Sequence, residues 1–504
     1  MNRIKGVIFS YALMVFEVLS TLLLTPYILR SLGQAEYGVY SLTLSITAYL
    51  LLLDMGVGNA VVRFISKYRA HSDIENQNKF LGISLIYYLI IATLVGILGA
   101  LMVRFAPLIF SKGLSTSESL LNQKLLIFTT ANAAITLGTA SFANVLIAYE
   151  RFTFSRLCSI FQIIIRMVVI YAALRMGYRS EAIVIINLAL TIILRSVFIL
   201  YIFYELKLKP VIRGVRLSDV KEIFVYSSLI FVQMIATMLN ASAAQIMLGC
   251  FITASSVYIA IYSIGLMLAS YFQSIGSSIT SVLMPGIVKL VESGATDCQL
   301  QKEMVRVGRI IFMVLGAILV IFCLNGSTFV SLWAGHDNTD AFPIAGVLMS
   351  MHLLIMTFSV GTQVLWAKNK HKEQTWLKMF GVVLNVTLTY FLIRWNPLVG
   401  ATIGTCVSLA LSDVLVMAWV FKKHIGLNLG EYCKQISKGT VPSLLVTAII
   451  GLPMTCYLPQ SWMMFVTSCA SMLIVYIAMM FIVGLNDYEK GLLSTVFQKI
   501  RRVN

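Results

Sequence analysis

Residues 79–104 read KFLGISLIYYLIIATLVGILGALMVR, and this stretch decides the class of fold. No residue between Lys79 and Arg104 carries a charge, and the run is long enough to cross about 30 Å of hydrocarbon as an α-helix. Thirteen similar stretches flank it along the chain. The fourteen predicted spans lie near residues 8–29, 39–62, 81–103, 125–148, 156–176, 181–203, 224–249, 254–284, 310–332, 341–366, 376–394, 398–421, 439–457 and 461–484.

The composition agrees with a protein that lies almost wholly in a membrane. Of its 504 residues, 59% are hydrophobic, which excludes an ordinary soluble domain. The formal net charge of +17 would suggest nucleic acid as the partner of a soluble protein. Here the basic residues flank the spans, so we interpret them as topology signals that contact anionic membrane lipids, and we expect no nucleic-acid partner.

The basic residues also orient the chain. If the N-terminus is cytoplasmic, the two ends and six of the gaps hold 29 of the 38 Lys and Arg residues, and the seven opposite gaps hold 7. The remaining two, Arg166 and Arg195, lie inside apolar stretches. Short loops with this asymmetry place their basic side in the cytoplasm. We therefore predict a multi-pass protein with both termini cytoplasmic.

The sequence offers little material for a catalytic or metal site. It contains no GxSxG or GxxxxGK[ST] motif, its eight cysteines form no CxxC pair, and its five histidines have no metal-ligand spacing. The longest predicted external loop, near residues 104–124, carries few groups with which to build a catalytic site. We expect no catalytic residues, no metal and no cofactor, and hence no enzyme.

The two halves of the chain resemble each other at a nearly constant offset. Residues 144–148 (NVLIA) close the fourth span and residues 363–367 (QVLWA) close the tenth, 219 positions later. Residues 38–40 (GVY) open the second span and residues 256–258 (SVY) open the eighth, at an offset of 218. Two separate matches that agree on the offset indicate a duplication. Gly58 and Gly276 share the offset of 218.

A repeat of six spans starts both copies on the same side of the membrane, so the copies should be related by an axis along the membrane normal. The predicted architecture has an N-terminal lobe over residues 1–220 and a C-terminal lobe over residues 221–430. Residues 431–504 add spans thirteen and fourteen and a tail. The apolar spacing of that tail is typical of an amphipathic helix on the inner leaflet, and a frayed tail is the alternative. Two lobes that rock about a central site suit alternating access.

Charges inside spans are the candidate functional groups, because each costs about 2.5–3.5 kcal/mol even on the insertion scale. Arg side chains in a cleft would suit a phosphate, which the planar guanidinium binds through a fork of donors. Amides of the second lobe would suit sugar hydroxyls, since an amide both donates and accepts. The candidates for substrate binding are Arg30, Arg63, Arg166, Arg195, Gln245 and Gln273, and the intramembrane acids are Glu17, Asp54 and Asp413.

Two alternatives remain open for these charges. Arg166 either faces a ligand or pairs with Glu17 or Asp54 as a structural ion pair between helices. Glu17 and Asp54 are candidates for proton coupling, because a desolvated carboxyl group holds its proton more tightly. Glu17 could equally serve only to neutralise Arg166. The sequence does not decide between these interpretations.

The stretch from Leu32 to Ala70 resembles the opening of the polysaccharide transport family. Leu32-Gly33 and Tyr37-Gly38 are followed by a span that ends in DMGVGNAVVR (54–63) and then by SKYRA (66–70). This family contains the Wzx-type flippases of the multidrug/oligosaccharidyl-lipid/polysaccharide exporter superfamily. The resemblance extends to the length, the fourteen spans and the duplicated lobes.

The resemblance implies a flippase of the bacterial inner membrane. Its substrate would be a polyprenyl-diphosphate-linked oligosaccharide that moves to the periplasmic leaflet for O-antigen, as in lipopolysaccharide biosynthesis, or for a similar surface polymer. A polysaccharide polymerase and a chain-length regulator are the implied protein partners. In this superfamily spans one, two, seven and eight line the cleft, which favours Glu17, Arg30, Asp54, Gln245 and Gln273 as lumen residues. The alternatives are a drug/cation antiporter of the same superfamily and an integral-membrane polysaccharide polymerase.

Overall fold

The computed structural model describes residues 2–211, 217–368, 370–457, 461–486 and 489–491. Within these ranges the chain forms helices and connecting turns and no β-strand. The predicted all-helical membrane fold is therefore confirmed. The predicted amphipathic tail falls almost entirely on residues outside the described ranges.

The contacts divide the chain into two compact units. Unit 1 comprises Met1–Ser263 and Asn385–Ala401, and unit 2 comprises Ile264–Leu384 and Thr402–Asn504. Unit 1 contains the first nine α-helices together with the start of α10 (Ser256–Glu292). Its α-helices are α1 (Asn2–Leu32), α2 (Gln34–Leu51), α3 (Val57–Ala70), α4 (Ile74–Ile109), α5 (Thr116–Gly138), α6 (Ala140–Ala148), α7 (Phe152–Arg175), α8 (Ser180–Tyr204) and α9 (Leu217–Phe251).

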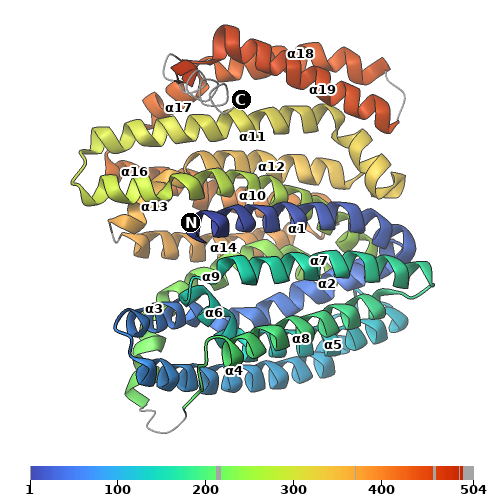
Figure 1. Cartoon of the computed structure of the whole chain (residues 1–504). Coiled ribbons are helices and arrows are strands. Elements are labelled where there is room, and N and C mark those ends of the chain that lie inside the picture. Colours follow the sequence, from blue (N-terminus) through green and yellow to red (C-terminus); the bar gives the residue numbers. More distant parts are fainter. Residues whose placement is uncertain (1, 212–216, 369, 458–460, 487–488, 492–504) are drawn as a thin grey trace, which may run out of the picture. The chain divides into compact units, whose positions relative to one another are not determined.

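Unit 2 continues α10 and ends with the last helical hairpin of the described chain. In Figure 1 its α18 and α19 lie beside each other, and α11 lies alongside α12. Two helices besides α10 are divided between the units, because the second unit-1 segment falls on the end of α14 and the start of α15. The bounds are α11 (Asp297–Ala334), α12 (Ala341–Thr357), α13 (Ser359–Ala367), α14 (His371–Leu392), α15 (Pro397–Leu409), α16 (Met417–Ile425), α17 (Leu429–Ser437), α18 (Thr440–Tyr457) and α19 (Trp462–Met479).

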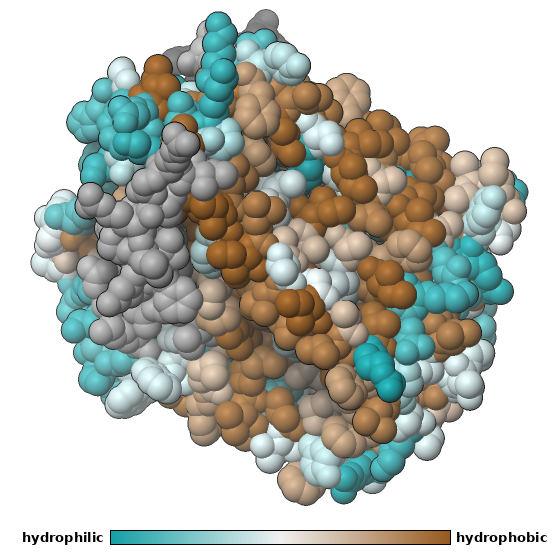
Figure 2. Space-filling model, turned by 90° about the horizontal axis from the view of Figure 1, so that it is seen from below, coloured by the Kyte–Doolittle hydropathy of each residue, from teal (hydrophilic) through white to brown (hydrophobic). Residues whose placement is uncertain are grey.

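The spans agree with the sequence prediction. Within the described ranges, eleven helices are long and apolar enough to cross a membrane, and three bent pairs of helices raise the number to fourteen if each pair is one span. Each of the fourteen predicted stretches overlaps one of these helices or pairs. Figure 2 shows one face of the molecule, on which hydrophobic residues form a broad central belt and hydrophilic residues gather toward the left and right margins.

One predicted loop was wrong. The external loop expected near residues 104–124 is only Phe110–Ser115, because α4 continues to Ile109 and α5 begins at Thr116. The Ser115 hydroxyl accepts from the backbone N–H of Glu118, whose carboxylate accepts from the Ser115 backbone, and this capping box fixes the start of α5. The apolar run of α4 extends through Leu108 and Ile109, which keeps the helix going past the point where Arg104 suggested an end.

The second span is broken in its middle. After α2 a short 3-10 helix (η1, Leu52–Asp54) is followed by two left-handed residues, Met55 (φ 53°) and Gly56 (φ 75°), before α3 starts. Two successive left-handed residues cannot continue a right-handed helix. The break therefore leaves Asp54 at the end of one helical segment and close to the start of the next.

The fourth and tenth spans bend at matching positions. The fourth span bends by 40° between α5 and α6, and the tenth bends by 42° between α12 and α13. The end of α12 lies 219 positions after the end of α5. The start and the end of α13 likewise lie 219 positions after the start and the end of α6. This is the offset of the sequence repeat. Superposition of residues 1–220 on 221–430 stays a prediction.

Candidate functional site

Asp54, at the break of the second span, sits in a small polar cluster of unit 1. Tyr88 on α4 donates its hydroxyl proton to the Asp54 carboxylate at 2.7 Å, and the Asn144 amide on α6 donates to the Tyr88 oxygen at 3.4 Å. Gly58 makes room for Asn144, since a Cβ at Gly58 would lie 2.9 Å from the Asn144 amide nitrogen. The neighbouring Tyr87 hydroxyl is buried and has no hydrogen-bond partner among the described residues. The cluster is therefore one acid among neutral donors.

The acids of unit 1 are not neutralised by the intramembrane arginines. Among the described residues, no ion pair joins Arg166 to Glu17 or to Asp54. Glu17 is exposed on α1, and Asp54 is half-buried. The structural ion pair that the sequence left open for Arg166 is therefore not formed among the described residues.

Arg166 and Arg195 come from adjacent helices, α7 and α8, which pack against each other. Arg166 is half-buried and lies near enough to the Tyr40 phenol to interact with it electrostatically. Arg195 is half-buried, and its Nε is sealed from solvent with no hydrogen-bond partner in the described part of the chain. A guanidinium N–H left unpaired inside a span is costly unless a ligand or water satisfies it.

The other predicted binding residues differ in their exposure to solvent, in their hydrogen-bond partners and in the unit to which they belong. Arg30 and Arg63 are exposed at the ends of the first and second spans. Gln245 is buried, accepts from the Ser45 hydroxyl and donates to the Ser263 hydroxyl at 2.7 Å, so its amide is occupied by protein groups. Gln273 belongs to unit 2 and is half-buried.

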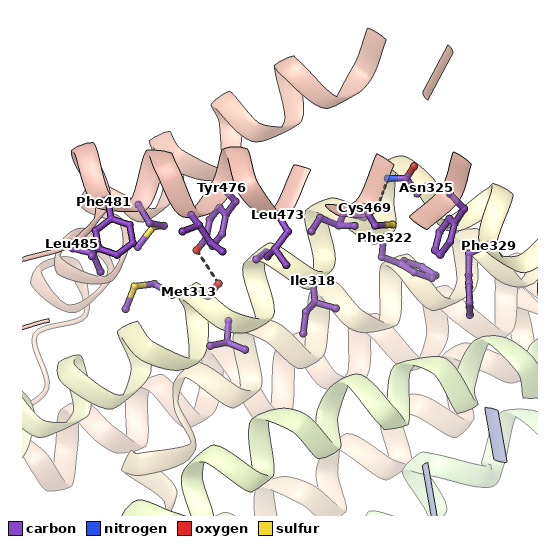
Figure 3. Close-up of a pocket in the computed structure, with 17 residues that line it drawn as sticks. Met313, Ile318, Phe322, Asn325, Phe329, Cys469, Leu473, Tyr476, Phe481 and Leu485 are labelled. Atoms are coloured by element: carbon purple, nitrogen blue, oxygen red, sulfur yellow. Dashed lines mark hydrogen bonds between the residues drawn. The ribbon is translucent and has the colours of Figure 1, made fainter. Parts of the chain in front are cut away.

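Unit 2 contains a long apolar groove of about 750 Å³ between α11 and α19. Figure 3 shows its lining residues in two rows, running from Leu485 and Phe481 at one end to Phe329 at the other. Phe481 and Ile477 are about half exposed, which opens the groove along one side. The groove is lined by Met313, Val314, Ala317, Ile318, Ile321, Phe322, Asn325, Gly326, Phe329, Phe465, Cys469, Leu473, Tyr476, Ile477, Met480, Phe481 and Leu485.

The few polar groups of the groove are satisfied by the protein itself. The Tyr476 hydroxyl donates to the Met313 carbonyl oxygen at 2.9 Å, as the dashed line in Figure 3 shows. The Asn325 amide oxygen accepts from Ser468 at 2.9 Å, and its nitrogen donates to the Ile321 carbonyl at 3.3 Å. The groove consequently offers an occupant dispersion contacts and apolar burial but almost no hydrogen bonds.

A buried ion pair fixes one end of this groove. Arg309 on α11 donates from Nε to Glu489 at 2.6 Å, and both side chains are less than a tenth exposed. Arg309 also donates to the carbonyl oxygens of Gln435 and Lys438, each at 2.7 Å, and to that of Gly484. Gly484 ends the π-helical turn η4 (Met480–Gly484), which contributes groove residues. We call this group the Arg309 clamp.

The sequence analysis missed the Arg309 clamp. Arg309 lies directly before an apolar stretch and was counted among the cytoplasmic loop charges. Its partner Glu489 lies 180 positions away, so no local pattern announces the pair. The clamp also reaches the bend of the tenth span. Tyr432, on the same short helix α17 as Gln435, is 1% exposed and donates to the Thr357 carbonyl at 2.5 Å.

The third intramembrane acid, Asp413, lies in a different setting. It occupies a π-helical turn (η3, Ala410–Val416) between α15 and α16. Its carboxylate accepts from the Ser412 hydroxyl at 2.6 Å, and the residue is half-buried. Such π-turns recur at functional sites, although this one belongs to unit 2 and not to the Asp54 cluster.

The comparisons with known proteins place this architecture. Residues 4–291 match the model of the family described as polysaccharide biosynthesis protein, which covers more than half of the chain. The chain belongs to this family. Over 182 residues it is 25% identical to the lipid II flippase MurJ of Bacillus subtilis (strain 168), a match that covers 36% of this chain and 32% of that protein. The matched part is thus about a third of that relative's length.

Solved structures show the same fold. A structure of lipid II flippase MurJ in an inward closed conformation superposes with a TM-score of 0.73 over 94% of this chain and 98% of that one, at 13% identity. A multidrug resistance MATE family transporter of the MOP superfamily, in an inward-facing conformation, superposes with a TM-score of 0.58 over 81% of this chain and 95% of that one, at 16% identity. The protein therefore has the fold shared by these two groups of membrane transporters.

Proposed function

We propose that this protein is a flippase that moves a polyprenyl-diphosphate-linked oligosaccharide from the cytoplasmic to the periplasmic leaflet by alternating access. The product would serve O-antigen or a related surface polysaccharide. The apolar groove of unit 2 carries this proposal, because a polyprenyl chain is a long hydrocarbon that needs apolar burial and no hydrogen bonds. Membership of the polysaccharide biosynthesis protein family supports a saccharide as the group at the other end.

The diphosphate would be held in unit 1. Arg195 has an unpaired N–H inside a span, and Arg166 on the adjacent helix has no ion-pair partner among the described residues. Two guanidinium groups can each offer a planar pair of donors to phosphate oxygens, with hydrogen bonds roughly twice as strong as those between neutral groups. The amides and exposed arginines named above, Gln273, Arg30 and Arg63, remain candidates for contacts with sugars.

Asp54 is our candidate for coupling transport to protons. Its carboxylate has a neutral hydrogen-bond donor in Tyr88 and no ion-pair partner in the described part of the chain, so gain or loss of a proton would change the net charge of the site. The second span is broken directly after Asp54, and discontinuous helices occur at the coupling sites of other transporters. Exposed Glu17 is the second candidate.

The location and partners follow from the same proposal. The protein would lie in the bacterial inner membrane with both termini in the cytoplasm, and a polymerase and a chain-length regulator would use its product. A reporter that is active only in the periplasm should be active when fused after Lys112 and silent when fused after Lys370. The reverse pattern would contradict the orientation.

Deletion of the gene tests the function in cells. If the protein is a flippase, the lipid-linked repeat unit accumulates on the cytoplasmic leaflet, where impermeant reagents added outside cannot reach it. A polymerase deletion would instead let single, unpolymerised repeats reach the surface. A drug/cation antiporter deletion would leave the surface polymer intact and change drug sensitivity.

A variant that fills the groove tests the part of the proposal that concerns the lipid. Ile321→Trp adds bulk inside the groove, and Leu452→Trp, on a half-exposed residue of α18 outside it, is the matched control. We expect the first variant to reduce export at normal protein abundance and the control to leave export unchanged. Unchanged export with Ile321→Trp would remove the groove from the transport path.

A further inference from the structure

Span two and span eight meet at their outer ends in unit 1. At this point α2 and α10 approach so closely that a Cβ added to Gly38 would overlap the carbonyl group of Ser256. Only glycine allows this approach without displacing backbone. Both residues are buried, and both stand near the N-terminal ends of their helices. The contact joins backbone to backbone, so no side chain can turn away to relieve a larger residue.

A second contact lies two helical turns further along the same helices. Gln245 on α9 accepts from Ser45 on α2 and donates to Ser263 on α10 at 2.7 Å. All three side chains are less than a tenth exposed. The amide thus bridges two hydroxyl groups, and each of its polar ends is occupied by one of them.

The two contacts have the same relation to the internal repeat. Ser256 lies 218 positions after Gly38, and Ser263 lies 218 positions after Ser45, which is the offset read from the sequence. In a two-fold arrangement a residue meets its own counterpart only at the axis. Gly38 approaches Ser256 directly, and Ser45 and Ser263 are joined through Gln245, seven residues or about 10 Å further along the helices. These two contacts indicate that the axis of the predicted repeat runs between α2 and α10.

The loop between α4 and α5 covers the outer end of this seam. The Ser255 backbone N–H donates to the Gly113 carbonyl oxygen at 2.9 Å, and the Ser255 hydroxyl donates to the same oxygen at 3.1 Å. The charge asymmetry of the loops places Gly113 and Ser255 on the external side of the membrane. All the residues of the seam belong to unit 1.

We propose that Gly38, Ser256 and the Ser45–Gln245–Ser263 bridge form the external gate of the transport path, closed in this structure. The inference rests on the proposed function, since a gate matters only to a transporter. A path between two copies of a repeat follows the axis that relates them, so residues that meet on the axis close it. The bridge consists of neutral hydrogen bonds that water can replace. The Gly38–Ser256 contact is between backbone atoms, so the two helices can separate there without a change of side-chain rotamer.

Thiol accessibility tests the gate without measuring transport. In a variant in which the eight native cysteines are replaced, Ser263→Cys reports on water reaching the seam from outside. We expect slow labelling by an impermeant thiol reagent, and labelling several-fold faster when Gly38→Ala is added. Gly96→Ala is the matched control, because this helical glycine of α4 has nothing within 4 Å of its added Cβ, and it should leave labelling unchanged.

Cross-linking ties the gate to transport. A short bis-methanethiosulfonate, which forms a disulfide bond to each cysteine and releases two sulfinate ions, should join Ser45→Cys to Ser263→Cys and stop export. A reductant cleaves these disulfide bonds and should restore export. Rapid labelling of Ser263→Cys without Gly38→Ala, or undiminished export after complete cross-linking, would overturn the gate. Neither result would contradict the proposal that the protein is a flippase. Absence of lipid translocation by the native protein, with the labelling pattern as expected, would instead overturn the proposed function and leave the seam as a closed contact.

Discussion

The two units treat buried polar groups in opposite ways. Of the eight buried side-chain polar atoms without a partner in the described residues, seven belong to unit 1 and one, on His352, belongs to unit 2. In unit 2 the buried guanidinium of Arg309 donates hydrogen bonds to one carboxylate and to three backbone carbonyl oxygens. In unit 1 the Nε of Arg195 has no partner.

The difference separates structure from function inside one membrane protein. A fully paired charge holds helices together and has nothing left to offer a ligand. An unpaired charge is a cost in the empty protein and becomes favourable when a ligand supplies the missing hydrogen bonds. We therefore expect changes in unit 2's clamp to reduce the amount of protein, and changes at unit 1's arginines to reduce transport by protein that is present in normal amounts.

Removal of Arg309 should have the largest effect on stability. Arg309→Ala leaves Glu489 buried and unpaired, and breaking a buried pair in this way costs on the order of 3–5 kcal/mol. We expect low abundance in the membrane and a lower melting temperature of the purified protein. Arg306→Ala is the matched control, because its pair with Glu303 is partly exposed and contributes at most about 1 kcal/mol.

The double variant sharpens this prediction. Arg309→Ala with Glu489→Ala removes the unpaired acid and should recover part of the lost stability. Normal abundance of the single variant would show that the clamp contributes little to stability. It would then contradict the proposed difference between the two units.

Arg195→Ala and Arg166→Ala should reduce transport rather than abundance. Charge-assisted hydrogen bonds to phosphate contribute about 1.5–3 kcal/mol, so we expect transport to fall roughly 10- to 100-fold. Lys should rescue only partly, because an ammonium keeps the charge and loses the planar fork. Surface polymer and protein abundance are measured together, with Arg175→Ala at the exposed C-terminal end of α7 as the control. Native transport by both Ala variants would exclude these arginines from the mechanism.

Asp54→Asn should have the smallest effect on folding. An asparagine oxygen can still accept from Tyr88, so the stability change should stay near 1 kcal/mol. The fixed neutral side chain can no longer gain or lose a proton, so we expect transport to stop responding to an imposed pH gradient. Asp73→Asn, at the exposed N-cap of α4, keeps a capping oxygen and is the control. An unchanged pH response in Asp54→Asn would move the coupling role to Glu17 or to another group.

The spans were predictable because about 20 uninterrupted apolar residues have only one common outcome in a membrane. The repeat stays a prediction: residues 38–40 lie in the first turns of α2, whereas residues 256–258 begin α10. Helix ends were less predictable. Arg104 and Lys124 suggested a long external loop, yet α4 and α5 extend almost to one another because a helix can continue well beyond the hydrocarbon.

The site was only partly predictable. A charge inside a span marks Arg195 and Asp54 as candidates, but the sequence could not say whether an arginine and an acid face each other. The clamp joins Arg309 to Glu489 across 180 positions, and the gate joins Ser45 to Gln245 across 200, so both depend on the tertiary fold. The break of the second span could not be predicted from the sequence either, because methionine rarely adopts the left-handed conformation that Met55 has here.

Lipid translocation by the purified protein tests the central claim most directly. The protein is reconstituted into liposomes that contain a polyprenyl-diphosphate-linked oligosaccharide, and an impermeant glycan-modifying enzyme reports the fraction that lies in the outer leaflet. Without flipping, about half of the substrate should stay protected, since lipids start evenly divided between leaflets and a charged headgroup crosses hydrocarbon very slowly. We expect the native protein to make nearly all of the substrate accessible and Arg195→Ala to slow this markedly. A protected half that persists with native protein, under an imposed pH gradient of either sign, would contradict the account.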